Sequence, residues 1–204
     1  MGYKPCIGRT FRGVDFRAAG LEIQDVALET EIKVLLEEGE LDRLRGTLRE
    51  VGALQVVGRS FEENLLFDDA GSSLTENGCA LRLRCYGGTC AVTFKGQVQP
   101  DRQFKKRPEF QVLVSESGAM RQILESLGLR VVFRYDKYRE KWELSDSRGP
   151  VEICLDETPI GDFIEIEAED VQIRDVAARL GLDETRFVRE NYVDLYLLAG
   201  LGEP

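Results

Sequence analysis

The segment from Glu29 to Lys33 alternates charged and uncharged residues. Successive side chains of a β-strand point to opposite faces, so this alternation predicts a strand with Glu29, Glu31 and Lys33 on one face. A charged face of this kind is typical of a strand that is half exposed to solvent. Two carboxylates beside an ammonium group are also suited to hold a divalent cation next to a phosphate. Further strands with the same pattern would favour the second interpretation.

Many other segments have the composition of short strands. We expect strands at residues 53–58, 61–68, 79–86, 89–96, 107–114, 130–144, 150–156 and 162–168. Gly87 and Gly88 would form the tight turn of a hairpin. Helices are expected over residues 40–51, 116–127, 171–180 and 183–198. These elements predict an α+β fold that is mainly antiparallel β. So many strands in one small domain favour closure into an eight-stranded β-barrel with a few flanking helices.

The patterned part of the chain extends over residues 27–200, which is enough for one domain with a substantial core. Residues 1–26 show no periodicity, and we expect them to form a loosely ordered extension. No apolar run approaches the roughly 18 residues needed to span a bilayer. The first residues also lack the apolar core of a signal peptide. We therefore expect a cytoplasmic protein that does not bind membranes.

The composition excludes several kinds of chemistry. Histidine is absent, so no nucleophile can be activated by histidine, and any metal has to be held by oxygen ligands. The net charge of -10 disfavours non-specific binding to nucleic acid, although it permits a local basic pocket. The five cysteines form no CxxC pair, and their odd number argues against a disulfide framework. We expect them to be free thiols.

Charged residues alternate with apolar ones along several expected strands. Acidic pairs occur at the first and last of these strands, and basic residues occur on the strands between them. Closed into a barrel, six such strands would enclose a polar lumen. Four carboxylates could bind one or two divalent cations there: Glu29, Glu31, Glu165 and Glu167. Six basic side chains could hold a polyanion: Lys33, Arg82, Arg84, Lys95, Arg107 and Arg139. Carboxylates and cations around a metal and phosphates are the minimum parts for phosphoryl transfer.

Several motifs in this order resemble the CYTH superfamily, also called the triphosphate tunnel metalloenzymes. They are ETEIK at 29–33, FEENLLFD at 61–68, LRLR at 81–84, TFKG at 93–96, KYREKW at 137–142 and LDETPIGDFIEIE at 155–167. The family includes class IV adenylyl cyclases, thiamine triphosphatases and inorganic triphosphatases. The resemblance implies an eight-stranded tunnel that depends on Mg²⁺ or Mn²⁺.

The resemblance also implies roles for individual residues. The four carboxylates named above would be metal ligands, and Glu29, Glu31 and Lys33 would be catalytic. Lys33, Arg82, Arg84, Lys95 and Arg139 would contact the triphosphate. Relatives often carry alternating acids where Gln111 stands here, which leaves the roles of Arg107 and Glu109 less defined. A homodimer would be in keeping with the family.

Two reactions are compatible with this site. Hydrolysis of an inorganic or organic triphosphate needs only the polyanion site and a water molecule. Conversion of ATP to cyclic AMP and pyrophosphate also needs an adenine pocket, which strand periodicity cannot locate. We therefore favour a metal-dependent triphosphatase, with a class IV adenylyl cyclase as the alternative. A module that binds triphosphate or polyphosphate without turnover is a third hypothesis.

Overall fold

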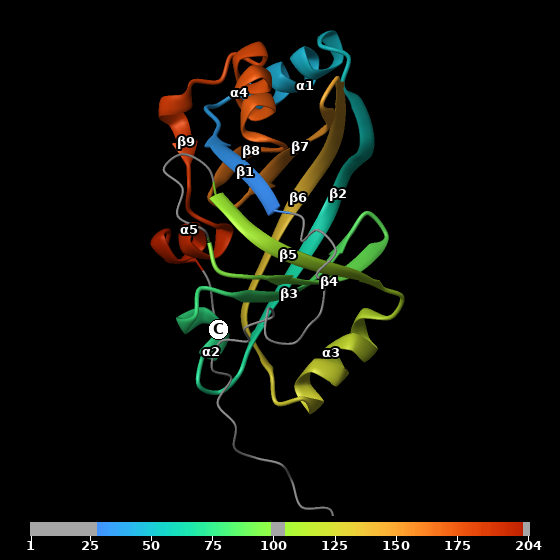
Figure 1. Ribbon diagram of the computed structural model, residues 1–204, viewed down its shortest axis with the longest axis vertical. Helices are drawn as coiled ribbons and strands as arrows, with labels where there is room; N and C mark the ends of the chain where they lie inside the picture. Colours follow the sequence, from blue (N-terminus) through green and yellow to red (C-terminus); the bar gives the residue numbers. More distant parts are fainter. Residues whose placement is uncertain (1–27, 99–104, 202–204) are drawn as a thin grey trace, which may run out of the picture.

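One antiparallel sheet dominates the computed structural model, which describes residues 28–98 and 105–201 (Figure 1). The expected extension over residues 1–26 lies outside these residues. The described strands are β1 (Leu28–Leu35), β2 (Leu54–Asp68), β3 (Ala80–Tyr86), β4 (Thr89–Lys95), β5 (Lys105–Val114), β6 (Arg130–Asp146), β7 (Gly149–Thr158), β8 (Gly161–Glu167) and β9 (Phe187–Val188). Their order in the sheet is β5-β4-β3-β2-β6-β7-β8-β1-β9. The predicted α+β fold with a mainly antiparallel sheet is confirmed.

The first strand, β1, has three neighbours. It pairs with β8 from Glu31 to Leu35 and with the short strand β9 at Lys33 and Val34. The first half of β1 also pairs with β5, where Leu28 lies opposite Pro108. The β5 end of the sheet therefore lies against β1, and β9 is a strand that the sequence did not predict.

The strand β2 corrects the two separate strands expected at 53–58 and 61–68. It runs without interruption from Leu54 to Asp68 and pairs with β6, with register shifts between Gln55 and Val57 and between Val57 and Ser60. Such irregularities bend a strand and leave a residue out of the ladder. Gly58 lies at this point, which explains why the sequence suggested a break there.

The helices are α1 (Glu40–Glu50), α2 (Ser73–Glu76), α3 (Ser117–Ser126), α4 (Asp170–Arg179) and α5 (Tyr192–Leu198), with a 3-10 turn at Glu184–Arg186. Three of the predicted helices match α1, α3 and α4 closely. The predicted helix over 183–198 is confirmed only for Tyr192–Leu198, which form α5, and is wrong before that. Asp183 accepts a hydrogen bond from the Thr185 N–H, and Asn191 accepts one from the Asp194 N–H. These two caps start two separate elements, and β9 lies between them. In the described part of the chain, no helix is long and apolar enough to cross a membrane.

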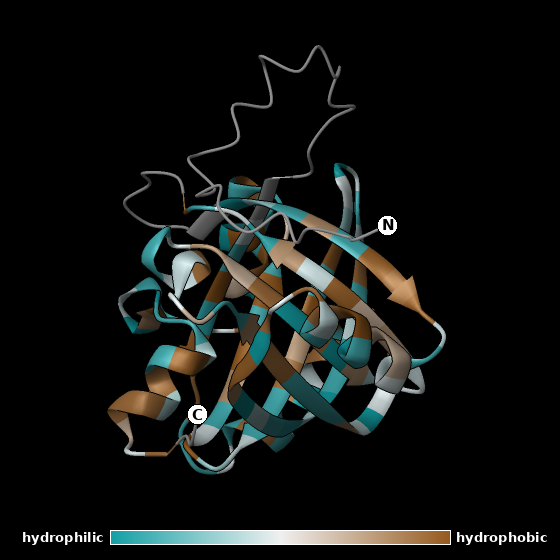
Figure 2. Cartoon of the chain, turned by 90° about the horizontal axis from the view of Figure 1, so that it is seen from below, coloured by the Kyte–Doolittle hydropathy of each residue, from teal (hydrophilic) through white to brown (hydrophobic). Residues whose placement is uncertain are grey.

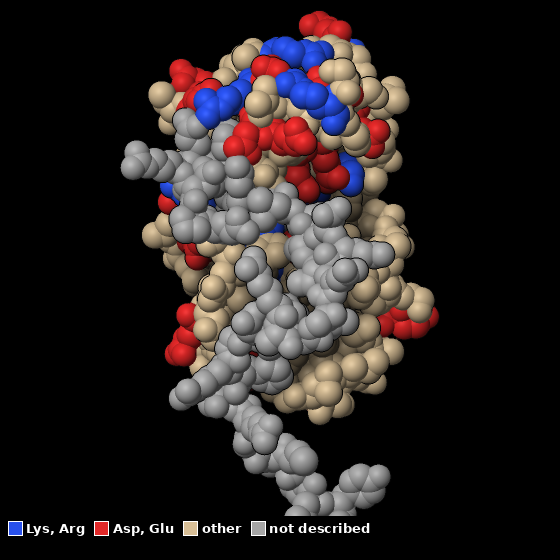
Figure 3. Space-filling model, viewed as in Figure 1, with Lys and Arg blue, Asp and Glu red and all other residues tan. Residues whose placement is uncertain are grey.

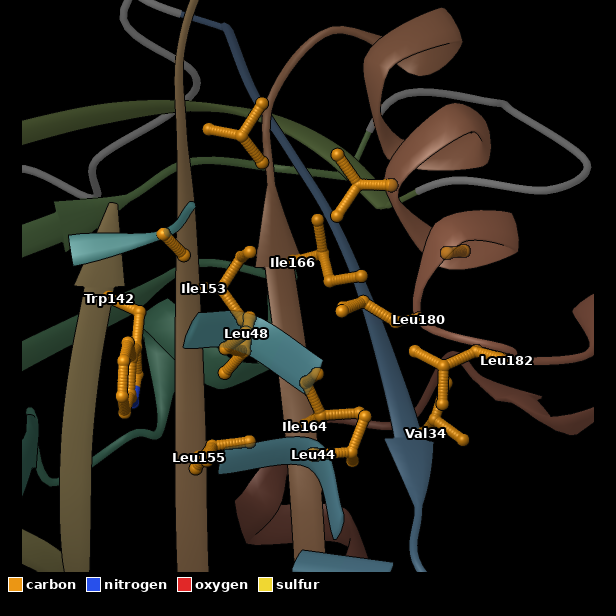
Figure 4. Close-up of a cluster of buried hydrophobic side chains, with 14 of the residues drawn as sticks. Val34, Leu44, Leu48, Trp142, Ile153, Leu155, Ile164, Ile166, Leu180 and Leu182 are labelled. Carbon is orange, nitrogen blue, oxygen red and sulfur yellow. The ribbon is translucent and has the colours of Figure 1, made fainter. Parts of the chain in front are cut away.

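The main core lies between the sheet and the helices α1 and α4 (Figure 4). Ile153 of β7, Ile164 of β8 and Val34 of β1 are fully buried, and Leu44 of α1 packs in the same cluster. Burial of one such side chain contributes about 1.5–3 kcal/mol. Because side chains alternate along a strand, this packing turns the charged residues of the same strands to the other face of the sheet. Figure 2 shows the alternation as bands of hydrophilic and hydrophobic residues along the strands.

The outer face of β3, β4 and β5 is covered less completely. Leu83 of β3 and Leu124 of α3 belong to a small buried cluster. On β5, Phe110 and Val112 remain 43% and 60% exposed. The surface around α3 is mainly uncharged in Figure 3, whereas basic and acidic side chains lie side by side over α1 and α4.

The cysteines correct a second prediction, because Cys85 and Cys90 form a disulfide. Gly87 and Gly88 have positive φ and form the predicted turn between β3 and β4. This turn places the two cysteines directly opposite each other in the ladder, with their Cα atoms 4.1 Å apart. The odd number of cysteines does not bear on such a local pair. Of the other three, Cys79 and Cys154 are free thiols and Cys6 lies outside the described residues.

Candidate functional site

A cavity of about 530 Å³ is lined by the charged face of the sheet, together with residues of α5 and of the segment before β3. Among the described residues that line it, eight are basic and six are acidic, although the whole chain has a net charge of -10. The basic residues are Lys33, Arg82, Arg84, Lys95, Arg107, Lys137, Arg139 and Lys141. The acidic residues are Glu31, Glu109, Glu152, Glu165, Glu167 and Asp194. The volume falls in the range of small-molecule sites.

Nearly all of the site residues expected from the sequence line this one cavity. The six predicted basic residues are all there, as are Glu31, Glu165 and Glu167. The side chain of Glu29 lies outside the part of the chain that the structure describes; its backbone belongs to β1 and pairs with Arg107.

Asp156 is the centre of a group of ion pairs at one side of the cavity. Its carboxylate is fully buried and accepts hydrogen bonds from Lys137 Nζ at 2.8 Å and from Arg139 Nε at 2.6 Å. The Tyr192 hydroxyl donates a further hydrogen bond to Asp156 Oδ2 at 2.5 Å. The sequence analysis gave Asp156 no role, because periodicity identifies the face of a strand but not the partners across it.

The same group of ion pairs extends to β1 and β8 through Glu165. Lys33 Nζ lies 3.0 Å from Glu165 Oε1, and Arg139 donates to the other carboxylate oxygen. We call Lys33, Lys137, Arg139, Asp156 and Glu165 the paired cluster. The carboxylates of this cluster shift the pKa values of its basic residues. Burial alone would lower the pKa of Arg139, but Asp156 and Glu165 raise it well above its ordinary value. In the same way, burial opposes the charge of Lys33, and Glu165 and Glu31 still raise its pKa.

Arg82 and Arg84 on β3 form a contrasting pair, which we call the arginine pair. They share one face of the strand and both line the cavity. The like charge of Arg82, together with burial, lowers the pKa of Arg84. Arg84 Nη2 donates a hydrogen bond to the amide oxygen of Gln111 at 3.4 Å, and this neutral acceptor supplies no negative charge. Two like charges on neighbouring positions repel each other, and an anion between them relieves the repulsion.

Glu62 on β2 is a site residue that the sequence analysis missed. It is fully buried and accepts a hydrogen bond from Asn64 Nδ2 at 2.9 Å. Burial would raise its pKa, but Lys137, Arg139 and the arginine pair lower it to about 2. Glu62 therefore connects the paired cluster with the arginine pair by its charge. The alternation in FEENLLFD places Glu62 and Asn64 on one face and could have identified both.

Lys95 and Glu109 form an ion pair on the neighbouring strands β4 and β5, with Nζ and Oε2 2.5 Å apart. Glu109 therefore faces the cavity as the partner of a lysine. Gln111 accepts a hydrogen bond from Thr93 Oγ1 at 3.0 Å in addition to its contact with Arg84. The amide in place of an acid at this position keeps the surroundings of the arginine pair more positive.

Three carboxylates form a row across adjacent strands. Glu31 of β1 lies directly opposite Glu167 of β8, which lies directly opposite Glu152 of β7. Lys141 pairs with Glu152 at 2.5 Å. Like charges in directly opposed positions are destabilising, and a divalent cation among them offsets this effect. The row therefore has the donor chemistry for Mg²⁺ or Mn²⁺. In the described residues no three ligands are already arranged around one metal position.

Comparisons with known proteins agree with this picture. A family model for the CYTH domain matches residues 27–189. The chain is 27% identical over 179 residues to "Putative adenylate cyclase MJ0240" of Methanocaldococcus jannaschii, which covers 82% of this chain and 98% of that protein.

Among solved structures, one from Vibrio parahaemolyticus, described as "a putative adenylate cyclase", matches with a TM-score of 0.70 and 18% identity over 83% of this chain and 98% of that chain. A Hippeastrum protein described as a "putative adenylyl cyclase" with a dominant triphosphatase activity matches with a TM-score of 0.57 and 17% identity, over 86% of this chain and 98% of that one. At these identities the two structures show a common fold.

Proposed function

The chain belongs to the CYTH domain family, and on this basis we propose that it is a divalent-metal-dependent enzyme that hydrolyses an inorganic or organic triphosphate and releases orthophosphate. The observation that carries the proposal is the arginine pair, whose repulsion lowers the pKa of Arg84 inside a cavity with eight basic side chains. Such a site gains from the binding of a compact polyanion. A triphosphate supplies three or four negative charges over a short length.

The proposal includes a closed tunnel of eight strands. The pairing of β1 with both β8 and β5 supports it, because these contacts join the two sides of the sheet through one strand. Side chains on the inner face would then be shielded from water. Charges interact more strongly in such surroundings than on an exposed surface.

The roles of the basic residues follow from their positions. The arginine pair, Lys95 and Arg107 would bind the phosphates from β3, β4 and β5. Lys33 and Arg139 would meet the triphosphate from the paired cluster, where Lys137 lies beside them. Because ion pairs already hold these two cations in place, they need little reorganisation when negative charge develops in the transition state.

The proposed metal ligands are Glu29, Glu31, Glu165 and Glu167, for Mg²⁺ or Mn²⁺. The row of carboxylates supports Glu31 and Glu167 in this role and adds Glu152 as a neighbour. Glu165 also holds Lys33 and Arg139, so it would orient the cations beside the metal. When bound, the cation would neutralise phosphate charge and lower the pKa of a coordinated water. Glu29, Glu31 and Lys33 are the residues that we assign to the catalytic step.

A class IV adenylyl cyclase is the second candidate. It is favoured by the name of the Methanocaldococcus jannaschii relative, because the match to this chain spans 98% of that relative's length. The Hippeastrum structure, on the same fold, is described with a triphosphatase activity. The polyanion site serves both reactions, which differ in the attacking group and in the phosphorus that is attacked.

Product analysis separates the two candidates. Purified protein is incubated with Mg²⁺ or Mn²⁺ and either inorganic tripolyphosphate or ATP, and the products are resolved by anion exchange. Orthophosphate without cyclic AMP is the expected result. Cyclic AMP with pyrophosphate would establish the cyclase instead, and binding without turnover would establish a binding module.

The metal ligands are tested by Glu31→Gln, which keeps the shape of the side chain and removes its charge. We expect the concentration of Mn²⁺ required for half-maximal activity to rise by about tenfold or more, because a charged oxygen ligand is lost. Glu63→Gln is the control, since Glu63 follows Glu62 on β2 and pairs on the outside with Arg134 at 3.0 Å. An equal response of the two variants would contradict the assignment.

A further inference from the structure

Tyr192 is the one aromatic side chain of α5 that lines the cavity, among the residues that the structure describes. It is the first residue of the helix and is buried to 6% exposure. The match to the family model ends at residue 189, so Tyr192 reaches the site from a segment beyond the matched region. Tyr192 is neither a proposed metal ligand nor a proposed phosphate-binding residue.

The contacts of Tyr192 involve three members of the paired cluster. Its hydroxyl donates to Asp156 Oδ2 at 2.5 Å. Its ring lies 4.4 Å from Lys33 Nζ and 4.0 Å from Lys137 Nζ, measured to the ring centroid. The edge-to-face contact with Phe163 at 5.5 Å fixes the plane of the ring.

These contacts hold the ammonium groups of two lysines and the guanidinium of Arg139 in place. An ammonium group within about 6 Å of an aromatic face is attracted to it, most strongly where both groups are shielded from water. Two lysines are held in this way by a single ring. The hydroxyl group fixes Asp156, which in turn orients the guanidinium of Arg139 through its Nε and Nη2 atoms. Burial and the nearby Asp156 raise the pKa of Tyr192, so its hydroxyl stays protonated and remains a donor.

We propose that Tyr192 is a positioning residue for the triphosphate: through its ring and its hydroxyl it fixes Lys33, Lys137 and the Asp156–Arg139 pair at the places where phosphate oxygens bind. This proposal rests on the proposed function. It makes α5 a part of the substrate site, since Tyr192 contacts both lysines and also Asp156, the carboxylate that pairs with Lys137 and Arg139.

The neighbouring Tyr196 offers a matched control. It lies on the same helix, has a similar exposure of 5%, and packs in the same aromatic cluster. Its hydroxyl also donates one hydrogen bond, at 2.7 Å, but the acceptor is the backbone oxygen of Asp136. Removal of either hydroxyl therefore deletes one buried hydrogen bond, and only Tyr192 is bonded to the paired cluster.

The test compares Tyr192→Phe, Tyr192→Leu and Tyr196→Phe with the unmodified chain. The dissociation constant of inorganic tripolyphosphate is measured by calorimetry in metal-free buffer, so that no turnover occurs. The free energy of unfolding is measured for each variant in urea. KM and kcat for tripolyphosphate are then measured with Mn²⁺.

We expect Tyr192→Phe to raise the dissociation constant about threefold to tenfold, which is less than the full loss of a hydrogen bond to a charged group because the hydroxyl acts on the phosphate site through Asp156. Tyr192→Leu also loses the contacts of the ring with both lysines and should raise the dissociation constant further. Tyr192→Phe, which keeps the ring, should therefore bind more tightly than Tyr192→Leu. KM should rise in the same order. Tyr196→Phe should also lower stability, through the loss of a hydrogen bond to a neutral acceptor, and leave binding unaltered.

Equal dissociation constants for Tyr192→Phe and Tyr196→Phe would overturn the proposal, as would binding losses that merely follow the loss of stability. If Tyr192→Leu does not fold, the two phenylalanine variants decide the question. Failure of the unmodified chain to bind tripolyphosphate would instead reject the proposed function itself.

Discussion

Arg139 on β6 and Arg84 on β3 line the same cavity, yet their pKa values shift in opposite directions. Arg139 has three carboxylates as partners: Asp156, Glu165 and, at 3.7 Å, Glu62. Arg84 has a second arginine beside it and an amide oxygen as its acceptor. Arg139 is thus neutralised by direct ion pairs, whereas Arg84 is held beside a like charge and is attracted to Glu62 by its charge alone.

The difference separates two tasks of a binding site. Ion pairs inside a protein hold side chains in fixed positions, and their removal leaves buried charges without partners. Like charges held close together lower stability and are favourable only when an anion is bound. We therefore expect substitutions in the paired cluster to lower stability as well as affinity, and those in the arginine pair to act mainly on affinity.

The largest expected effect is that of Asp156→Ala. This change removes the buried carboxylate that lies 2.8 Å from Lys137 Nζ and 2.6 Å from Arg139 Nε. Breaking a buried ion pair in this way costs about 3–5 kcal/mol. The free energy of unfolding in urea measures the loss. Asp42→Ala is the control, because Asp42 pairs with Arg45 at 2.6 Å while its side chain is 85% exposed, which predicts a loss of about 1 kcal/mol or less. Equal losses would remove the distinction between the two sides.

The next effect is an acid-dependent loss of stability through Glu62, whose charge interacts with both the paired cluster and the arginine pair. Its pKa is lowered from 4.5 in the unfolded chain to about 2 in the folded protein. Ionised Glu62 therefore contributes stability above pH 4.5, and the contribution is lost as the pH falls from 4.5 towards 2. We expect Glu62→Gln to lower the free energy of unfolding at pH 7 by roughly 2 kcal/mol and to flatten its decline below pH 4.5.

Glu40→Gln is the matched control for this pH profile. The pKa of Glu40 is also about 2, but the main cause is its hydrogen bond with Arg186 near the surface. Added salt should therefore reduce the pH dependence due to Glu40 and leave that of the fully buried Glu62 largely unchanged. Equal sensitivity to salt would show that water reaches Glu62.

The smallest of these effects on the fold, and the clearest on binding, is that of Arg84→Ala. The variant removes a charge that repels Arg82 and also attracts Glu62, so we expect little change in stability. We expect the dissociation constant of tripolyphosphate to rise by about tenfold, which is the loss of one charge-assisted contact. Calorimetry measures it. Arg134→Ala removes an arginine whose side chain is 57% exposed, and binding should be unchanged. If the Arg84 variant were less stable but bound tripolyphosphate normally, the assignment of the arginine pair to affinity would be contradicted.

The alternation of residues predicted which side chains share the cavity, because the period of a strand fixes the face on which each one lies. Lys33, Arg82, Arg84 and Arg139 were placed together on this ground alone, and all four line the cavity. Predicting their opposite electrostatic surroundings required the register of the strands. The partner of Arg139 on β7 is Asp156, a pairing that arises only once the two strands are aligned.

The segments that were predicted least well are those where local caps and long-range packing compete. Asn191 lies within the segment 183–198 that was expected to be one helix, and as the N-cap it starts α5 at Tyr192. The hydroxyl of Tyr192 then meets a carboxylate 36 residues earlier in the chain. No period in the sequence indicates such a contact, because it depends on how a short helix packs against the finished sheet.

The disulfide between Cys85 and Cys90 lies one residue beyond Arg84 on the strand that carries the arginine pair. A reductant added during purification to protect Cys79 and Cys154 would also open this bridge. Preparations made with and without dithiothreitol would then differ in the covalent structure of the hairpin next to the proposed phosphate site. The oxidation state of the sample is therefore a variable to be fixed before affinities from different preparations are compared.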